Sequence, residues 1–276
     1  MDDAMDDAVD WINGDPTLLR RIRASQPEVV SPVLPDDVAI SALPADGPCP
    51  GGLLFTPADA TGIPTVYFHG GGFVVGSPET HRIVTAWIAH LTRAPVISVR
   101  YRLAPEHPLP AQAQDAVAAI RRQLARHPRL RLMGDSAGGL VALWGHAGLT
   151  ATEQARIEEA VLLYPGGLPV PPPPATLDET TGLGPLSLAS YQRRLDPEGL
   201  SPGNPAFDPL TRGFALPRRL TVLGATLDPV CNQAEALARL PGTRLVLAEG
   251  LGHSFLAALP DETAAAPLRA ALGIAP

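Results

Sequence analysis

The segment Gly134–Gly138, GDSAG, has the residue types required for nucleophilic catalysis by serine. An apolar run, Leu130–Met133, precedes it, and a helix-favouring run, Ala137–Leu149, follows it. A serine at such a sharp strand-to-helix turn is held exposed, because the small flanking residues permit a strained backbone. The positive potential of the helix N-terminus then lies beside the point of attack. We therefore predict that Ser136 is a nucleophile.

A loop with three consecutive glycines follows another apolar run. His69-Gly70-Gly71-Gly72 comes directly after Thr65–Phe68. Glycines after a buried strand let the backbone approach a ligand closely and aim its N–H groups outward. Beside an activated serine, such amides, together with that of Ala137, would bind the oxyanion of a tetrahedral intermediate. The alternatives are a plain flexible turn and a phosphate-binding loop, but the latter requires GxGxxG opening a helix. We expect His69 to brace the loop.

A serine hydroxyl also needs a base and an orienting carboxylate. Among seven histidines, His253 is the predicted base because it lies in a loop directly after the apolar run Leu245–Ala248. His107 lies in a proline-rich turn, and four other histidines fall within predicted helices, where a surface or packing role is expected: His81, His90, His127 and His146.

Asp228 is the predicted acid, because it follows the apolar run Leu220–Leu223 and gives the chain order Ser, Asp, His. The alternative for Asp228 is a turn or helix-capping role. Asp208, in a proline-rich segment, and Glu249, directly after the last apolar run, are weaker candidates for the acid.

The surrounding elements alternate in type along the chain. Strands are predicted at Thr65–Phe68, Val96–Tyr101, Leu130–Met133, Ala160–Tyr164, Leu220–Leu223 and Leu245–Ala248, with an earlier strand pair within residues 28–57. Helices are predicted at Glu79–Thr92, Ala111–His127, Ala137–Leu149, Asn232–Leu240 and Asp261–Leu272. This order predicts an α/β fold, a mostly parallel sheet with helices on both faces. Catalytic groups are expected at the carboxyl ends of its strands.

Residues 165–217 interrupt this alternation. They are rich in proline, with 12 of the 32 prolines, and contain one predicted helix, Leu186–Leu195. A long excursion between two core strands is usually functional or disordered. The segment is predicted to cover the strand ends as a lid, with a solvent-exposed loop as the alternative.

Composition excludes several classes of chemistry. The 276 residues suit a single domain, and they include no lysine. A Schiff-base enzyme and a P-loop both require the amine of a lysine, so both classes are excluded. Cys49 and Cys231 belong to no cluster and are expected to be free thiols. With no signal peptide, membrane span, basic stripe or ligand-spaced metal cluster, we expect a cytoplasmic protein that needs no metal and binds no nucleic acid.

Three stretches resemble the hormone-sensitive-lipase-like branch of the α/β-hydrolases, a bacterial esterase family. They are His69–Phe73 (HGGGF), Tyr101–Ala111 (YRLAPEHPLPA) and Gly134–Gly139 (GDSAGG), and the likeness extends over about residues 65–260. The resemblance implies an α/β-hydrolase fold, with an eight-stranded, mostly parallel sheet, helices on both faces and a small cap from about residues 1–45 and 165–217. It also implies a Ser136–His253–Asp228 triad and an oxyanion hole of the Gly71, Gly72 and Ala137 amides. Arg102 and Glu106 would form a bracing network.

Members of this family typically hydrolyse short- to medium-chain acyl esters without a cofactor, and many are dimers. The sequence departs from the family at Leu140, where asparagine is common, and at Asn232-Gln233, where acidic residues are common.

The predicted function is hydrolysis of carboxylic esters through an acyl-enzyme, on a small-molecule substrate and without a cofactor. A histidine base predicts activity that declines below about pH 6.5, where an ordinary imidazole takes up a proton. An acyltransferase or amide deacylase with the same triad is the alternative enzyme. A non-catalytic ligand receptor is a further alternative, although such proteins usually lose a triad member.

Overall fold

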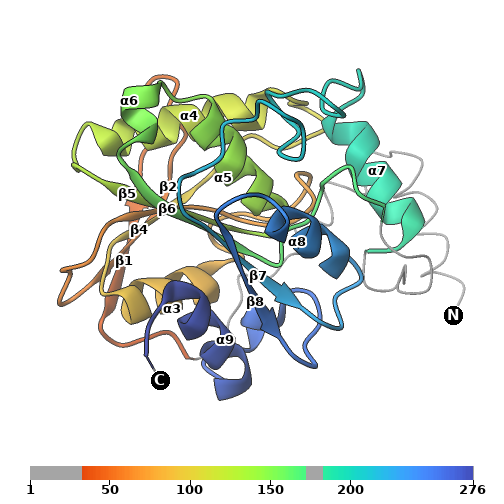
Figure 1. Ribbon diagram of the computed structural model, residues 1–276. Coiled ribbons are helices and arrows are strands. Elements are labelled where there is room, and N and C mark those ends of the chain that lie inside the picture. Colours follow the sequence, from red (N-terminus) through yellow and green to blue (C-terminus); the bar gives the residue numbers. More distant parts are fainter. Residues whose placement is uncertain (1–32, 172–182, 276) are drawn as a thin grey trace, which may run out of the picture.

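An eight-stranded sheet runs through the computed structural model, which describes residues 33–171 and 183–275. The strands lie in the order β1-β2-β4-β3-β5-β6-β7-β8 (Figure 1). They are β1 Val38–Leu43, β2 Gly52–Pro57, β3 Thr65–Phe68, β4 Val96–Val99, β5 Leu130–Asp135, β6 Ile157–Leu163, β7 Leu220–Ala225 and β8 Thr243–Ala248. The β1–β2 and β2–β4 pairs are antiparallel, and the remaining pairs are parallel. The predicted α/β fold with a mostly parallel, eight-stranded sheet is confirmed.

Helices cover both faces of this sheet (Figure 1). They are α3 Arg82–Thr92, α4 Ala111–Leu124, α5 Ala137–Ala147, α6 Ala151–Gln154, α7 Pro185–Leu195, α8 Cys231–Ala238, the 3-10 helix η3 Phe255–Ala258 and α9 Glu262–Leu272. Residues of α4, α5 and α8 pack in one apolar core, and residues of α3 and α9 pack in the other. Consecutive β3 residues alternate between them, Val66 and Phe68 in the first and Tyr67 in the second, as the period of a strand requires.

The strand register places the candidate site at one edge of the sheet. Phe68 pairs with Gly134, Asp135 with Leu163, and Ala225 with Ala248. The carboxyl ends of β3, β5, β7 and β8 are therefore level, and the loops that follow them emerge together. This is the edge at which ligands bind in open α/β sheets.

The strand pair expected within residues 28–57 is present as β1 and β2, joined in antiparallel register. Residues 38–43, which the sequence assigned to the cap, thus belong to the sheet. The physical reason is that this segment satisfies its backbone hydrogen bonds on β2, at the edge of the sheet. Residues 1–32 of the predicted cap lie outside the described residues.

Within the excursion 165–217, the predicted helix is present as α7. It lies at the end of the molecule where the parallel strands of the sheet end (Figure 1). Leu188, Tyr191 and Gln192 of this helix line the pocket that contains Ser136. Residues 172–182 of the excursion are not among the described residues.

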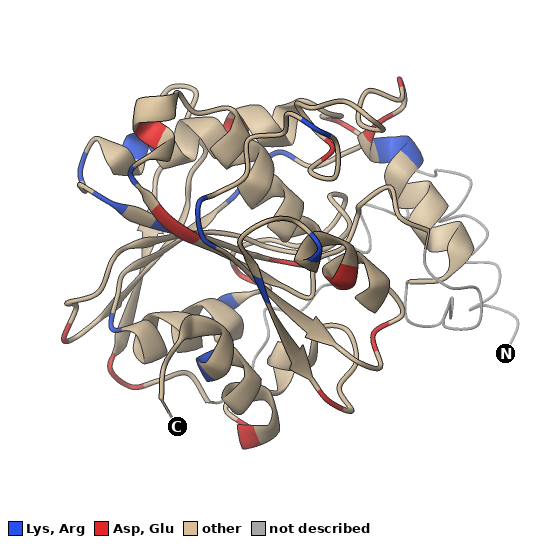
Figure 2. Ribbon diagram, viewed as in Figure 1, with Lys and Arg blue, Asp and Glu red and all other residues tan. Residues whose placement is uncertain are grey.

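Charged residues of both signs are interspersed along the same elements (Figure 2). On the sheet, the Arg131 guanidinium lies 2.7 Å from the Glu159 carboxylate, and Arg219 lies 3.0 Å from Glu158. Cys49 and Cys231 are free thiols, as predicted. Within residues 33–171 and 183–275, no helix is both long and apolar enough to cross a membrane.

Candidate active site

Ser136 lies at the turn between β5 and α5. Its backbone has φ 49° and ψ −124°, and its amide donates to the Leu163 carbonyl oxygen at 2.8 Å. The turn is possible because Gly138 has no side chain: a Cβ there would lie 2.0 Å from the Phe68 carbonyl oxygen. The strained residue and the close approach of strand and helix are the features of a nucleophile elbow. They hold the Ser136 hydroxyl out of the core, at the edge of the sheet.

Ser136, His253 and Asp228, three residues far apart in sequence, meet at this edge. His253 Nε2 lies 2.9 Å from Ser136 Oγ, and His253 Nδ1 lies 2.7 Å from Asp228 Oδ2. The Asp228 side chain is 1% exposed, and its Oδ1 accepts the Val230 amide at 2.9 Å. Both carboxylate oxygens are therefore engaged, which fixes the imidazole in the orientation needed to accept the serine proton.

The weaker acid candidates lie elsewhere. Asp208 is buried, and its carboxylate accepts from the Gly203 and Leu210 amides and the Thr211 hydroxyl. Asp208 therefore stabilises a turn of the proline-rich excursion. Glu249 is exposed after β8. The loop after β7 instead brings Asp228 to His253.

The glycine loop after β3 faces the same space as Ser136. Gly71 has φ 110°, and a Cβ on it would lie 2.3 Å from the Val75 carbonyl oxygen. This conformation is one that glycine adopts readily. Gly71, Gly72 and Ala137 line the pocket together with Ser136 and His253. Within the described residues, these three amides donate to no backbone carbonyl oxygen. Amides of this kind, beside a serine hydroxyl, are the donors that an oxyanion hole requires.

His69 supports the glycine loop through contacts with Tyr101. Its buried ring stacks on Tyr101 at 4.3 Å between centroids, and the Tyr101 hydroxyl donates to the His69 carbonyl oxygen at 2.7 Å. Burial, with the positive charge of His81, lowers the pKa of His69 to about 3. His69 is thus neutral and packed at physiological pH. This agrees with a bracing role.

The Tyr101–Ala111 stretch is held by a partner that the sequence did not indicate. Arg102 Nε donates to both oxygens of Asp115 at 3.0 Å, and Arg102 NH2 donates to the Ala111 carbonyl oxygen at 3.3 Å. Gln112 Nε2 donates to the carbonyl oxygens of Arg102 and His107. Arg102 therefore fixes this stretch to the start of α4 through Asp115.

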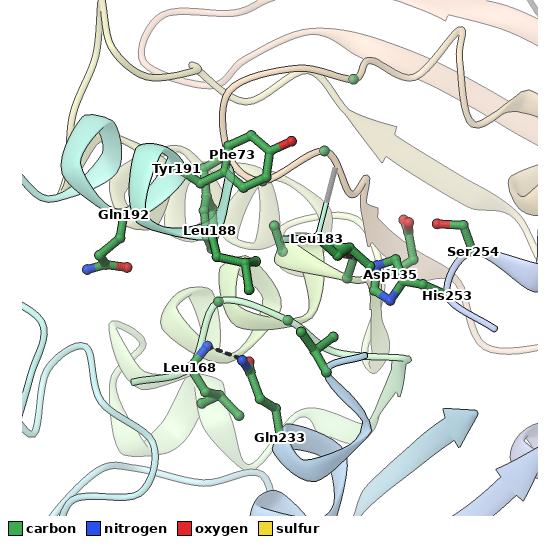
Figure 3. A pocket seen from close by; sticks show the side chains of 18 of the residues that line it. Phe73, Asp135, Leu168, Leu183, Leu188, Tyr191, Gln192, Gln233, His253 and Ser254 are labelled. Carbon is green, nitrogen blue, oxygen red and sulfur yellow. Dashed lines mark hydrogen bonds between the residues drawn. The ribbon is translucent and has the colours of Figure 1, made fainter. Parts of the chain in front are cut away.

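A cavity of about 560 Å³ opens in front of Ser136. Its wall opposite the triad includes α7 and the segment after β6 (Figure 3). Gln233 of α8 holds that segment: its Oε1 accepts the Leu168 amide at 2.8 Å, and its Nε2 donates to the Val170 carbonyl oxygen at 3.2 Å. Gln233 is 3% exposed, so this pair of bonds is shielded from water. Acidic residues are common in the family at this position, and the glutamine found here instead makes contacts that shape the pocket.

Sequence reasoning missed His81 and Asp135. His81 was expected to have a surface or packing role within a helix. It instead lies just before α3, lines the pocket, and places Nε2 3.3 Å from Asp135 Oδ2. One signal was available: Asp135 ends a buried strand, and a buried carboxylate requires donors or a counter-charge. Which residue supplies that counter-charge depends on the path of the chain before α3.

No group of three His, Cys, Asp or Glu side chains among the described residues is arranged to hold a metal ion.

Comparison with known proteins agrees with this fold and site. A family model described as the alpha/beta hydrolase fold matches residues 65–257. The chain therefore belongs to the α/β-hydrolase family. The crystal structure of an esterase from the bacterial hormone-sensitive lipase family superposes with a TM-score of 0.74, at 26% identity, over 95% of this chain and 90% of that one. The resemblance to this branch of the family is confirmed.

Two curated relatives match over shorter stretches. Esterase LipI of Mycobacterium tuberculosis is 48% identical over 85 residues, which are 28% of this chain and 26% of the relative. The tuliposide A-converting enzyme b1 of Tulipa gesneriana is 41% identical over 118 residues, 36% of this chain and 30% of the relative. The chain thus spans less than a third of the length of these relatives.

Proposed function

We propose that this protein is a serine hydrolase of carboxylic esters with short- to medium-chain acyl groups. The observation that carries the proposal is the continuous contact from Asp228 through His253 to Ser136, in front of glycine-loop amides. The esterase names of its relatives agree with it.

The reaction follows from these positions. Ser136 Oγ attacks the ester carbonyl carbon as its proton passes to His253 Nε2, while Asp228 holds the Nδ1–H of the imidazolium. The negative charge on the former carbonyl oxygen is bound by the amides of Gly71, Gly72 and Ala137. His253 then gives its proton to the departing alcohol, which leaves an acyl-enzyme. Water, deprotonated by His253, releases the acid and restores Ser136.

The pocket supports uncharged acyl groups. Its described lining includes Phe73, Leu168, Val170 and Leu188, and no arginine. His81 also lines it, but this side chain is paired with Asp135. A carboxylate on the acyl chain of a substrate would therefore meet no unpaired positive charge there. Residues 183–217, with α7 over the pocket, are proposed to act as the cap that covers the substrate.

Reaction with a fluorophosphonate probe, followed by hydrolysis of p-nitrophenyl esters of increasing acyl length, tests the proposal. We expect labelling of Ser136 and turnover of the shorter esters. A chain that neither reacts with the probe nor hydrolyses any ester would be a receptor, not an esterase. Added alcohol as acyl acceptor, and an anilide as substrate, distinguish an acyltransferase and an amide deacylase.

Two points about the whole protein stay open to test: the homodimer that the family resemblance allows, and the predicted cytoplasmic location. Light scattering in solution and cell fractionation test them.

A further inference from the structure

A second histidine–carboxylate pair lies beside Ser136 and takes no part in the steps above. It consists of His81 and Asp135, whose Nε2 and Oδ2 atoms are 3.3 Å apart. The Asp135 side chain is 4% exposed, whereas that of His81 is 19% exposed, and both line the pocket. The buried Asp135 carboxylate therefore directly precedes Ser136 in the chain, and the His81 imidazole that pairs with it faces the pocket.

Asp135 joins the glycine loop to the strand that carries Ser136. Its Oδ1 accepts the Gly70 amide at 2.9 Å and also accepts the Tyr67 hydroxyl. Gly70 immediately precedes the two glycines of the proposed oxyanion hole. Hydrogen bonds of this kind are strong because the acceptor is ionised. The carboxylate thus sets the distance between the oxyanion amides and the serine.

This position has an electrostatic cost. A negative charge in a buried site next to a developing oxyanion opposes its formation, and the low dielectric strengthens the effect. A protonated His81 removes the difficulty because it neutralises Asp135. His81 Nδ1 lies 2.9 Å from the Thr80 hydroxyl oxygen and 3.2 Å from the Ser77 carbonyl oxygen. An imidazolium therefore donates one N–H to these acceptors and has the other for Asp135.

The ionisation of both groups agrees with this geometry. Burial by itself lowers the pKa of His81, but the charge of Asp135 and the contact with it raise that pKa above 6.5 overall. Burial by itself raises the pKa of Asp135, but His81 and the Tyr67 hydroxyl hold that pKa below its ordinary value. The other titratable or charged groups near His81 are His69, Tyr101, Glu79, Arg82, Arg100 and, across the pocket, His253.

We propose that His81 is a positioning residue, which as an imidazolium neutralises Asp135 and so lets that carboxylate hold the oxyanion loop without opposing the oxyanion. The inference rests on the proposed ester hydrolysis. Its consequence is a pH profile of kcat with an alkaline limb. This limb reports loss of the proton from His81, which leaves the Asp135 charge unbalanced.

The test is steady-state hydrolysis of p-nitrophenyl acetate from acidic to alkaline pH by the wild type and His81→Gln. The neutral variant is expected to lower kcat about tenfold, less than the roughly 100-fold or greater loss of a direct oxyanion donor, because His81 acts through Asp135. KM should change little, and the alkaline limb should disappear. His90→Gln is the matched control, because His90 lies in α3, the helix that follows His81, with a side chain that is 39% exposed and paired with Asp37. It should leave the profile unchanged.

Asp135→Asn provides a second test. Asparagine still accepts the Gly70 amide but carries no charge, so this variant should also lack the alkaline limb. The double variant, Asp135→Asn with His81→Gln, should have a higher kcat than His81→Gln alone, because no unbalanced charge remains. These two variants keep the test available should His81→Gln not fold.

The inference is overturned by a wild-type rate that stays constant into the alkaline range, by an alkaline limb unchanged in His81→Gln or Asp135→Asn, or by a double variant no faster than His81→Gln. A wild type that hydrolyses no p-nitrophenyl ester and reacts with no fluorophosphonate overturns the proposed function as well. The two failures are thus distinguishable.

Discussion

At the scale of single residues, the site depends on a few positions whose conformation is unfavourable by itself. Ser136 has φ 49° and ψ −124°, outside the regions that L-residues usually occupy. Such a backbone costs about 1–3 kcal/mol and persists only where the surroundings enforce it. Here the ends of β5 and α5 and the bond to Leu163 enforce it. The strain keeps the hydroxyl directed at His253.

Replacing Ser136 by Ala removes the proposed nucleophile while leaving the turn intact. Because the residues of a catalytic triad act as a unit, kcat is expected to fall by about six orders of magnitude. Hydrolysis of p-nitrophenyl acetate, with the folded state checked by thermal unfolding, measures the loss. A variant with near-normal turnover would exclude Ser136 from the mechanism.

Gly138→Ala tests the close approach of helix and strand. The new Cβ would lie 2.0 Å from the Phe68 carbonyl oxygen, so α5 must shift. We expect a loss of about 1–3 kcal/mol in the free energy of unfolding, the usual range for overpacking. Gly139→Ala is the matched control, because its Cβ would lie 3.3 Å from the Pro165 Cβ. Equal effects in urea unfolding would contradict this account.

At the scale of elements, α8 connects the triad to the pocket wall. Asp228 and Val230 lie in the turn that leads into the helix, and Gln233 lies in its first turn. Gln233 holds both the Leu168 amide and the Val170 carbonyl oxygen, as a neighbouring strand would. The element that carries the proposed acid therefore also sets the position of the segment that faces the acyl chain.

Gln233→Met removes both bonds while keeping the side chain a similar size. The segment 168–170 then loses the hydrogen bonds of the Leu168 amide and the Val170 carbonyl oxygen to α8. Because this segment faces the acyl chain, kcat/KM should fall more for the longer p-nitrophenyl esters than for the acetate. Leaving buried backbone groups unpaired should also cost about 1–3 kcal/mol of stability. Asn232→Ala, which removes an exposed bond to Pro171, is the control. An equal loss for every acyl length would mean that Gln233 does not shape the pocket.

At the scale of the whole molecule, the buried His69 and the half-buried His81 make stability depend on pH in opposite directions. Burial lowers the pKa of His69 to about 3, so below pH 6.5 the unfolded chain binds a proton that the folded chain does not. Stability then falls with decreasing pH. The pKa of His81 is raised above 6.5, so its contribution is complete below that value and is lost as pH rises through the raised pKa.

The free energy of unfolding is therefore expected to be greatest near neutral pH. Each group contributes at most about 1.4 kcal/mol per pH unit within its own range. Urea unfolding across the pH range measures both slopes. His81→Gln should flatten the alkaline slope and His69→Asn the acidic one, each without affecting the other. A variant in which the acidic and the alkaline slopes change equally would contradict the assignment of one slope to each histidine.

The sequence by itself determined the fold and the edge of the sheet at which the site lies. The alternation of apolar runs with helices specified a parallel sheet, and each motif followed a run. Because the carboxyl ends of parallel strands meet at one edge, residues directly after Phe68, Asp135 and Ala248 had to lie near one another. Local order along the chain was enough for this, and it predicted Ser136 and His253 together at that edge.

The tertiary structure alone decided which side chains outside the predicted triad touch. Arg102 pairs with Asp115, and His81 turns towards Asp135. The distance between these residues depends on the course of the loops that connect the strands and helices. Neither the composition of the chain nor the periodicity of its apolar residues determines that course. Contacts between loops arise from packing and buried charge, which the whole fold must satisfy at once.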